Sequence, residues 1–460
     1  MTRTLVRGGW VVTPLAVEKL DILIDGERIA GLLRSGTRVQ AETVIDASGA
    51  VILPGAIDGH THFIPLDPEG DHPLHLDHEG FRPGGCAAAA GGVTTIVEMP
   101  QGYPPTVSKE GLKRKRRLAE PKAIVDFALW GGVQPEPSPG VIQGMVQAGA
   151  VGFKGYTCSG DPDLPMLEDA EILATLEMLK DSGIMLGLHT ENDSLLRANM
   201  ARVRASGRSD PLAHADSRPP IIETVDVHRV IYLAETVGGW VHIVHMSTVE
   251  SAELVRRAKG RGVKVTAEVA PHHLALDLED LARHGNYAKC VPPLRSRPEV
   301  EKLWDYLADG TIDCIASDHC GWTHRAKVGD GRDIWSAASG VTSVQTMLPA
   351  VITEARKRGF SWVDIARWTA WNPARLWKLR PRKGAIQVGA DADLVFVDEH
   401  TQWTVRAEGL LHAQKWSPFE GKMMDGRVTR TILRGTTIFQ DSSTEGITVE
   451  AGVGQFIAGA

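Results

Sequence analysis

Eight short apolar runs, separated by segments with helical periodicity, are the feature that most constrains how this chain can fold. Apolar runs that alternate with helices are the pattern of βα units around a parallel sheet. Eight such units are the number that closes a (β/α)8 barrel, the TIM barrel, so we predict that α/β fold in preference to an open doubly wound sheet. The runs are VILPGAIDGHTH (51–62), TTIVEMP (94–100), VDFALWG (125–131), AVGFKGY (150–156), IMLGLHTE (184–191), WVHIVHMS (240–247), VKVTAEVAPHH (263–273) and DCIASDH (313–319).

The segments between the runs support the barrel. In four of them apolar residues recur three and four positions apart, and these four end in glycine. We therefore expect helices on the outside of the sheet at 168–183, 223–239, 249–262 and 297–310. The basic run KRKRR at 113–117 falls between the second and third strands, where we expect the solvated face of a helix rather than a nucleic-acid patch.

The two ends of the chain differ from its middle, because both consist of short strand-like segments joined by turns. Asp25-Gly26 is a hairpin signal near the start, and TLVRGGWVV at 4–12 resembles TILRGTTIF at 431–439. We infer one small β-sandwich domain built from both termini. The expected boundaries are 1–50 for its first part, 51–380 for the barrel, 381–440 for its second part and 441–460 for a C-terminal tail.

Charge and cysteine content narrow the expected partners and compartment. The 460-residue chain has a formal net charge of −7 and no strongly basic half, so we expect a small-molecule ligand rather than nucleic acid or a membrane. The sequence has no run of about 18 apolar residues and no signal-peptide pattern, which predicts neither membrane insertion nor export. The five cysteines form no Cys-x-x-Cys pair, and such a sparse set fits a reducing cytoplasm better than a disulfide framework.

Side chains that can bind metal stand near the ends of five of the predicted strands. His60 and His62 are two residues apart at the end of the first run, so both imidazoles can face the same side. Lys154 lies on the fourth run, and the carboxyl ends of barrel strands are where active sites are built. The fifth, sixth and eighth runs carry His189, His245 and Asp318 at or near their ends.

Taken singly, most of these residues have a structural explanation, since a buried histidine is usually satisfied by a partner and Asp318 could cap the next element. Lys154 is harder to explain, because an unpaired cation inside a barrel is costly and histidines cannot pair with it. Six such positions are too many for one tetrahedral ion but suit two ions. A carbamate formed between Lys154 and carbon dioxide would turn the lysine into an anionic bridge between two metals.

Motifs along nearly the whole chain carry a resemblance to a known family. From about residue 50 to residue 440 the sequence resembles the amidohydrolase superfamily and, within it, the cyclic amidohydrolases: hydantoinases, allantoinases, dihydropyrimidinases and dihydroorotases. The matching motifs are PGAIDGHTH (54–62), VGFKGY (151–156), LHTEN (188–192), HIVHMST (242–248), EVAPHH (268–273), KCVPPLR (289–295), IASDH (315–319), NPARLW (372–377) and KGAIQVGADADLVF (383–396).

The resemblance implies a hydrolase with a binuclear metal centre. His60, His62, carboxylated Lys154 and Asp318 would hold one divalent metal, and Lys154, His189 and His245 would hold the other. Zinc is the expected ion, although manganese, cobalt and iron suit the same ligands. A hydroxide shared by the metals would attack the amide carbon, and Asp318 would act as general base and then as general acid toward the leaving nitrogen. Related enzymes often form tetramers, so we expect a homo-oligomer.

Departures from the related sequences indicate the substrate. Dihydroorotase-like sequences usually follow His-x-His with an arginine that holds a carboxylate, but Phe63-Ile64 stands here. Dihydropyrimidinase-like and many D-hydantoinase-like sequences carry a tyrosine five residues after the bridging lysine, and here that position is Ser159. The segments EMPQGYPPT (98–106), VDFALWGG (125–132), GAVGFK (149–154) and GQFIAGA (454–460) look most like the allantoinase and L-hydantoinase branch. This branch implies hydrolysis of a five-membered cyclic ureide, hydantoin or allantoin.

The same resemblance suggests substrate contacts. Ser159 and the backbone groups of Val291 and Gly340 are expected to contact the ureide, while Tyr103, Tyr156 and Cys158 either form the substituent pocket or simply pack. Two alternatives stay open. The chain could act on a six-membered ring as a dihydropyrimidinase or dihydroorotase, or it could be a non-catalytic relative that serves as an interaction protein.

Three further histidines and one cysteine lie near the predicted site. His242 has the opposite strand parity to His245, so we expect it to face the outer helices. His272 and His273 are adjacent at the end of the seventh run, so their side chains should point oppositely, and we expect a structural or supporting role for both. Cys320 is expected to pack.

Overall fold

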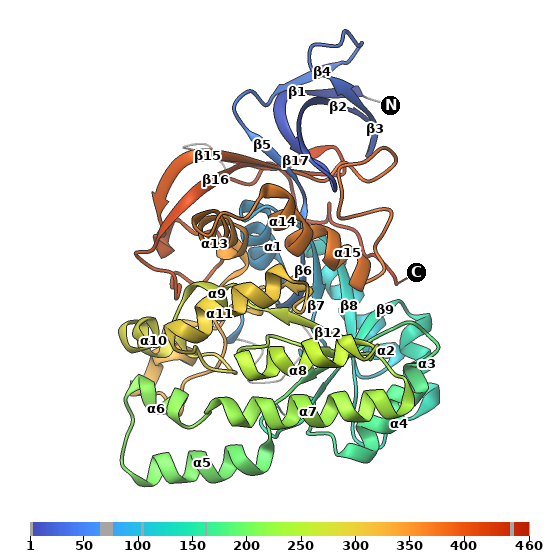
Figure 1. The fold of residues 1–460 in the computed structure, drawn as a ribbon. Coiled ribbons are helices and arrows are strands. Elements are labelled where there is room, and N and C mark those ends of the chain that lie inside the picture. The colour runs from blue at the N-terminus through green and yellow to red at the C-terminus, as the bar shows by residue number, and fades with distance from the viewer. Residues whose placement is uncertain (1–2, 65–76, 103–104, 162, 442–445, 460) are drawn as a thin grey trace.

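The strands of the larger domain are parallel neighbours in one sheet, seen in the lower part of Figure 1. The computed structural model describes residues 3–64, 77–102, 105–161, 163–441 and 446–459. The order in the sheet is β13-β12-β11-β10-β9-β8-β7-β6-β14. These strands are β6 (Ala56–His62), β7 (Val93–Glu98), β8 (Asp126–Gly132), β9 (Ala150–Tyr156), β10 (Leu186–His189), β11 (Val241–Ile243), β12 (Val265–Val269), β13 (Cys314–Ile315) and β14 (His319–Cys320).

The eighth apolar run closes the sheet into a barrel. Its first part, β13, pairs with β12, and its second part, β14, pairs with β6 at the other end of the order. Asp58 on β6 reinforces the closure, because its Oδ1 accepts hydrogen bonds from the backbone N–H groups of Ser317 at 2.8 Å and of His60 at 3.2 Å. The (β/α)8 barrel predicted from the sequence is confirmed.

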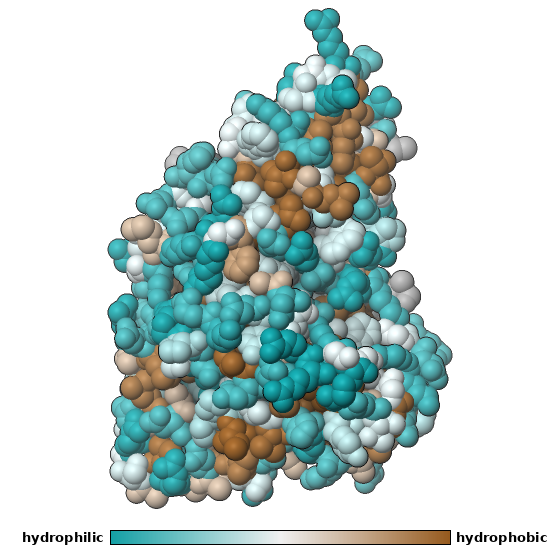
Figure 2. All heavy atoms as spheres, viewed as in Figure 1, coloured by the Kyte–Doolittle hydropathy of each residue, from teal (hydrophilic) through white to brown (hydrophobic). Residues whose placement is uncertain are grey.

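Helices cover the outside of the barrel, including all four that the sequence predicted. The surface over α8 is mostly hydrophilic, as expected for a helix with one face toward water (Figure 2), whereas α7 exposes the apolar residues Ile221, Val225 and Tyr232. Within the described ranges, every helix is too short or too polar to cross a bilayer. The helices are α1 (Phe81–Ala90), α2 (Lys109–Ala119), α3 (Pro139–Gln147), α4 (Asp169–Leu179), α5 (Asp193–Ala205), α6 (Pro211–Asp216), α7 (Pro220–Val237), α8 (Val249–Gly260), α9 (Pro271–Ala275), α10 (Leu278–His284), α11 (Arg297–Ala308), α12 (His324–Val328), α13 (Val344–Lys357), α14 (Trp362–Ala366) and α15 (Asn372–Leu376).

Two tryptophans fill the interior of the barrel. The Trp130 indole N–H donates to the Gly59 carbonyl at 2.9 Å, and the Trp130 and Trp377 rings meet edge to face with centroids 6.1 Å apart. The strands leave room for these rings by carrying glycine opposite them. A Cβ at Gly152 would lie 2.5 Å from Trp130, and one at Gly59 would lie 1.9 Å from Trp377. The indoles therefore form an apolar layer inside the barrel.

Strands from both ends of the chain form a second sheet, at the top of Figure 1. Its order is β17-β16-β15-β5-β1-β2-β3, with β4 pairing with β1. The strands form one continuous sheet, and apolar residues from its two halves pack into one cluster. The strands are β1 (Arg3–Val12), β2 (Val17–Asp25), β3 (Arg28–Arg34), β4 (Thr43–Asp46), β5 (Val51–Pro54), β15 (Leu394–Thr404), β16 (Met423–Leu433) and β17 (Thr436–Gln440).

The first apolar run is shared between the two sheets. Its residues 51–54 form β5, which pairs with β15, and the run enters the barrel only after Gly55, whose N–H donates to the Asp393 carbonyl at 2.9 Å. In the structure, residues 51–54 therefore belong to the small domain, whereas the predicted boundary was residue 50.

A buried ion cluster joins the second sheet to the barrel. The Lys383 ammonium lies 2.6 Å from carboxylate oxygens of Asp126 and Asp393 and 2.9 Å from Asp391. Asp126 also pairs with Arg434. These charges are largely buried, so each depends on the others for compensation. The cluster connects the start of β8 to residues that lie more than 250 positions further along the chain.

One basic residue departs from the predicted solvated helix face. Within KRKRR, Lys113, Arg116 and Arg117 are exposed on α2, but Lys115 is buried. The Lys115 ammonium donates to the carbonyl oxygens of Met99 at 2.6 Å and Gln101 at 2.5 Å. Burial lowers the pKa of Lys115 to about 8. This lysine stabilises the loop after β7 instead of facing water, because the loop carbonyls need a donor.

Replacing Gly152 by alanine is expected to destabilise the barrel. The added methyl group would overlap the rigid Trp130 ring, and overpacking of a tight core costs about 1–3 kcal/mol. Chemical denaturation of Gly152→Ala should report this loss in the free energy of unfolding. The matched control is Gly260→Ala on α8, where a Cβ meets nothing within 4 Å. Equal stability of the two variants would contradict the predicted packing.

Candidate metal centre

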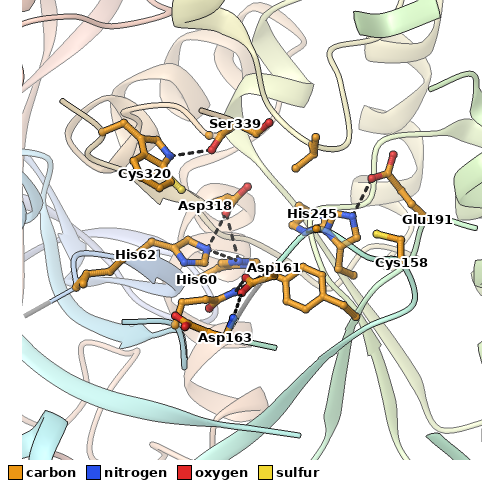
Figure 3. A pocket seen from close by; sticks show the side chains of 18 of the residues that line it. His60, His62, Cys158, Asp161, Asp163, Glu191, His245, Asp318, Cys320 and Ser339 are labelled. Atoms are coloured by element: carbon orange, nitrogen blue, oxygen red, sulfur yellow. Dashed lines mark hydrogen bonds and ion pairs between the residues drawn. The ribbon is translucent and has the colours of Figure 1, made fainter. Parts of the chain in front are cut away.

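The six predicted ligands converge at the carboxyl ends of the barrel strands. Five of them line a cavity of about 380 Å³, shown in Figure 3, and Lys154 is fully buried beside it. The cavity wall also includes Ile64, Gln101, Tyr156, Cys158, Ser159, Asp161, Glu191, Arg218, Val291, Cys320, Trp322 and Gly340. Residues from strands far apart in the sequence therefore meet around one space.

His60, His62 and Asp318 form the first group of ligands. The Asp318 Oδ1 atom lies 3.2 Å from His60 Nε2 and 3.3 Å from His62 Nε2, as the dashed lines in Figure 3 mark. The two Nε2 atoms are themselves 3.3 Å apart. Three lone-pair donors that converge this closely fit a divalent cation between them.

His189 and His245 form the second group. The Nδ1 atom of His189 lies 3.1 Å from Nε2 of His245, and the His245 ring is 5.4 Å from the His60 ring between centroids. The two groups are therefore adjacent. Burial lowers the pKa of both His60 and His245, which favours the neutral imidazole that binds metal.

Lys154 is the buried cation that the sequence singled out. Its side chain is inaccessible to solvent, and its Nζ atom has no hydrogen-bond partner among the described residues. Burial lowers the pKa of Lys154 to about 8, while the charges of Asp318 and Glu268 oppose that shift. An amine without a partner at this position fits a site that a further group completes.

Asp318 remains a carboxylate despite its burial. Burial alone would raise its pKa, but the electrostatic interaction with the His60 ring and a hydrogen bond from His62 hold the pKa well below the usual value. Asp318 and His245 also adopt positive φ angles of 49° and 36°. Residues other than glycine rarely adopt such angles, and the strain concentrates at functional sites. Here it turns both side chains toward the cavity.

Two buried carboxylates outside the predicted set hold the histidines in place. Glu268 Oε1 lies 2.5 Å from Nδ1 of His60, and Glu191 Oε2 lies 2.8 Å from Nε2 of His189. Each contact leaves the other ring nitrogen facing the cavity. Burial would raise the pKa of Glu268, but the electrostatic interaction with the His60 ring and a hydrogen bond from His242 lower it to about 2. Such carboxylates fix the tautomer and orientation of metal-binding histidines.

Glu191 has a second partner in Arg218, whose guanidinium forms an ion pair with it beside the cavity. Sequence reasoning missed both glutamates. They lie within the motifs EVAPHH and LHTEN, next to histidines or strand ends, and that adjacency was the one available signal.

The orientation expected for His242 was wrong. Its Nδ1 contacts Thr266 Oγ1 at 2.8 Å and its Nε2 lies 3.3 Å from Glu268, so the ring points into the barrel rather than toward the outer helices. The parity argument failed because β11 ends at Ile243 and the backbone turns before His245.

The expectation for His272 and His273 was also wrong in its geometry. The two residues lie in α9 rather than at the end of a strand, and their ring centroids are 4.5 Å apart, so their side chains do not diverge. His273 Nε2 contacts the Pro292 carbonyl at 3.1 Å, and both side chains are buried.

The predicted substrate contacts all lie at the cavity wall, except Tyr103, which falls outside the described residues. Ser159 is exposed, and its hydroxyl donates to Asp193 at 2.6 Å. The Gly340 backbone is engaged at both polar atoms, because its N–H donates to the Lys289 carbonyl and its C=O accepts from Lys327. Cys320 is a free buried thiol at the wall.

Comparisons with known proteins show which family and which enzymes this chain resembles. Residues 51–438 match the family described as the amidohydrolase family. An L-hydantoinase from Paenarthrobacter aurescens is 32% identical over 460 residues, spanning 99% of this chain and 98% of the relative. An allantoinase from Rubrobacter xylanophilus is 36% identical over 457 residues, spanning 99% and 96%. A solved L-hydantoinase (dihydropyrimidinase) structure from Arthrobacter aurescens matches with a TM-score of 0.93 and 31% identity, covering 100% of both chains.

Replacing Glu268 by glutamine is expected to weaken metal binding. The variant keeps the size of the side chain but loses the charge that orients His60, and loss of such a partner typically costs 10–100-fold, roughly, in metal affinity. Competition titration of Zn²⁺ against a chelator measures the change. The control is Glu235→Gln, which alters a surface carboxylate paired with Arg261 and should leave the affinity unchanged. Equal affinity of the two variants would contradict the assignment.

Proposed function

The chain belongs to the amidohydrolase family, and we propose that it is a metal-dependent cyclic amidohydrolase. Its substrate is a five-membered cyclic ureide, hydantoin or allantoin, and the bond broken is a ring amide C–N bond. The observation that carries this proposal is the convergence of His60, His62, His189, His245, Asp318 and buried Lys154 at one cavity. The full-length similarity to an L-hydantoinase and to allantoinases supports the choice of ring.

Amidohydrolases generally use two divalent metal ions, and the donor set of this chain suits such a pair. We assign His60, His62 and Asp318 to one ion and His189 and His245 to the other, with Lys154 shared by both. Zinc is the first choice, and manganese, cobalt or iron would suit the same ligands. When bound, the metal ions supply a hydroxide nucleophile at neutral pH and polarise the carbonyl group.

Lys154 can serve as the shared ligand only in a modified form. Its amine attacks the carbon of carbon dioxide and loses one proton, which gives a carbamate with one negative charge. The burial of Nζ and its lack of a hydrogen-bond partner among the described residues support this assignment. The carbamate replaces an uncompensated buried cation with an anion among neutral imidazoles and metal ions.

Asp318 is the residue that moves the proton. Its carboxylate faces the same space as His60 and His62, so it can accept a proton from the attacking hydroxide and give it to the leaving nitrogen. The product is a single ring-opened molecule that carries a new carboxylic acid and the nitrogen released from the ring amide. During this step Asp58 holds the backbone, and Glu191 and Glu268 hold His189 and His60 in place.

The cavity wall supports a neutral ring. Among the described residues of the loop after β6, Ile64 gives the wall an apolar side chain, and the Arg218 guanidinium at the wall is already paired with Glu191, which disfavours a dihydroorotase. A dihydropyrimidinase is the second candidate, because the matching L-hydantoinase from Arthrobacter aurescens is also described as a dihydropyrimidinase. The presence of all six ligand positions disfavours a non-catalytic interaction protein. The cytoplasmic location and the homotetramer stay predictions.

A substrate panel tests the proposed function. We expect the zinc-loaded protein to open allantoin or 5-substituted hydantoins of one hand faster than dihydrouracil or dihydroorotate, because the site is built for a neutral five-membered ureide. Ring opening is followed by loss of ultraviolet absorbance and by product mass. Activity confined to the six-membered rings would contradict the proposed substrate, and activity on no ring would contradict the enzyme assignment.

Replacing Lys154 by alanine should remove both metal binding and activity, because the shared ligand is lost. Elemental analysis of metal per subunit and native mass spectrometry of the carboxyl modification provide the two measurements. Lys180→Ala, at an exposed lysine that follows α4, is the control and should retain both properties. Partial rescue of Lys154→Ala by a short carboxylic acid is expected, and full metal content in the unrescued variant would contradict the bridge.

A further inference from the structure

The hydroxyl group of Tyr156 is a polar group at the cavity wall that the proposed reaction does not yet use. Tyr156 lies two residues after Lys154 on β9, so both side chains leave the same face of the strand. Its ring stacks on His189, with centroids 5.1 Å apart and an interplanar angle of 27°. The Lys154 Nζ atom lies 4.9 Å from the centre of the ring. The Tyr156 phenol therefore lies directly beside two of the proposed metal ligands, His189 and Lys154.

A neighbouring amide fixes the direction of the Tyr156 hydroxyl. The Gln101 Nε2 group donates to the hydroxyl oxygen at 2.5 Å and to Asp161 Oδ2 at 2.9 Å. Because a carboxylate only accepts, the contact with Asp161 determines that the NH₂ end of Gln101 faces both partners. The hydroxyl oxygen of Tyr156 therefore accepts from Gln101, and its own proton must point elsewhere. It makes no other hydrogen bond within the described part of the chain.

The support behind Gln101 is rigid. Buried Lys115 donates to the carbonyl oxygens of Gln101 and Met99, so the loop that carries the amide is held from below. A donor held in place before the reaction loses little energy to reorganisation when charge develops near it. The hydroxyl of Ser159, on the loop after β9, donates to Asp193 and is not available for this role.

We propose that Tyr156 is a further catalytic residue, whose hydroxyl donates a hydrogen bond to the oxygen of the ring carbonyl under attack. Gln101 is its positioning residue. The inference rests on the proposed function for the identity of the ring. When hydroxide adds to the carbonyl carbon, the π electron pair moves to the oxygen, and Tyr156 stabilises that negative charge while keeping its proton. When the C–N bond breaks, the pair returns to form C=O, and the leaving nitrogen takes a proton from Asp318.

Tyr156→Phe tests this inference in the metal-loaded enzyme, because it keeps the ring that stacks on His189 and removes only the hydroxyl. Loss of one such donor typically lowers kcat by about 10²–10³-fold, and we expect that fall with KM and metal content unchanged. A ring analogue with a tetrahedral phosphinate at the attacked carbon should lose affinity by a similar factor. This binding measurement needs no turnover.

Two further variants separate catalysis from structure. Tyr287→Phe removes another partly exposed tyrosine hydroxyl, one that contacts His324 at 2.8 Å outside the cavity wall, and should leave kcat and phosphinate affinity unchanged. Gln101→Met should lower kcat by less than Tyr156→Phe does. The double variant should match Tyr156→Phe alone, because the amide acts through the hydroxyl.

Three results would overturn the inference: a wild-type kcat in Tyr156→Phe, a fall in kcat matched by loss of metal, or a raised KM at unchanged kcat. The first would leave the proposed function intact, since the wild type would still open its ring. Activity of the wild type on six-membered rings alone would overturn the proposed substrate but not the role of Tyr156, which the same variants test on that ring. A protein that opens no ring overturns both.

Discussion

The double pairing of the eighth apolar run is the constraint on which the site depends. By joining β12 through β13 and β6 through β14, residues 314–320 bring the end of the barrel sequence against its beginning. Asp318 lies in the interruption between these two short strands, where its positive φ turns the carboxylate toward His60 and His62. An open sheet would leave these groups at opposite edges. The pairing that closes the barrel therefore also brings together His60, His62 and Asp318, the first group of candidate ligands.

Around this centre, two histidines are each hydrogen-bonded to a buried glutamate. Glu268 contacts His60 and Glu191 contacts His189, and each glutamate is buried where it must remain charged. Burying a carboxylate is unfavourable unless a partner satisfies it, so the orientation of the imidazoles and the ionisation of the glutamates depend on one another. Below them the Trp130 and Trp377 indoles fill the barrel interior. The site combines a layer of paired glutamates and histidines with an apolar layer of indole rings.

The barrel was predictable, and so was the convergence of the six candidate ligands at one rim, because both follow from local pattern: apolar runs, helical spacing and residues near strand ends. The remaining features depend on tertiary contacts between particular atoms, which sequence spacing does not determine. His242 was misplaced because parity holds only along an unbroken strand, and β11 ends at Ile243. Lys115 was misplaced because its partners are backbone carbonyls of a loop. The roles of Glu191 and Glu268 depend on the direction of histidine rings, which no sequence spacing encodes.

The shared second sheet determines the order in which the molecule can be completed. Strand β5 pairs through residues 51–54 with residues 394–397 of β15, and Lys383 and Arg434 reach back to Asp126 on β8. A ribosome releases the first strands and most of the barrel before any of these partners exists. In the nascent chain, the edge of β5 and the carboxylate of Asp126 are therefore exposed before their partners have been synthesised. The last stage of folding is the long-range pairing of the two ends of the chain.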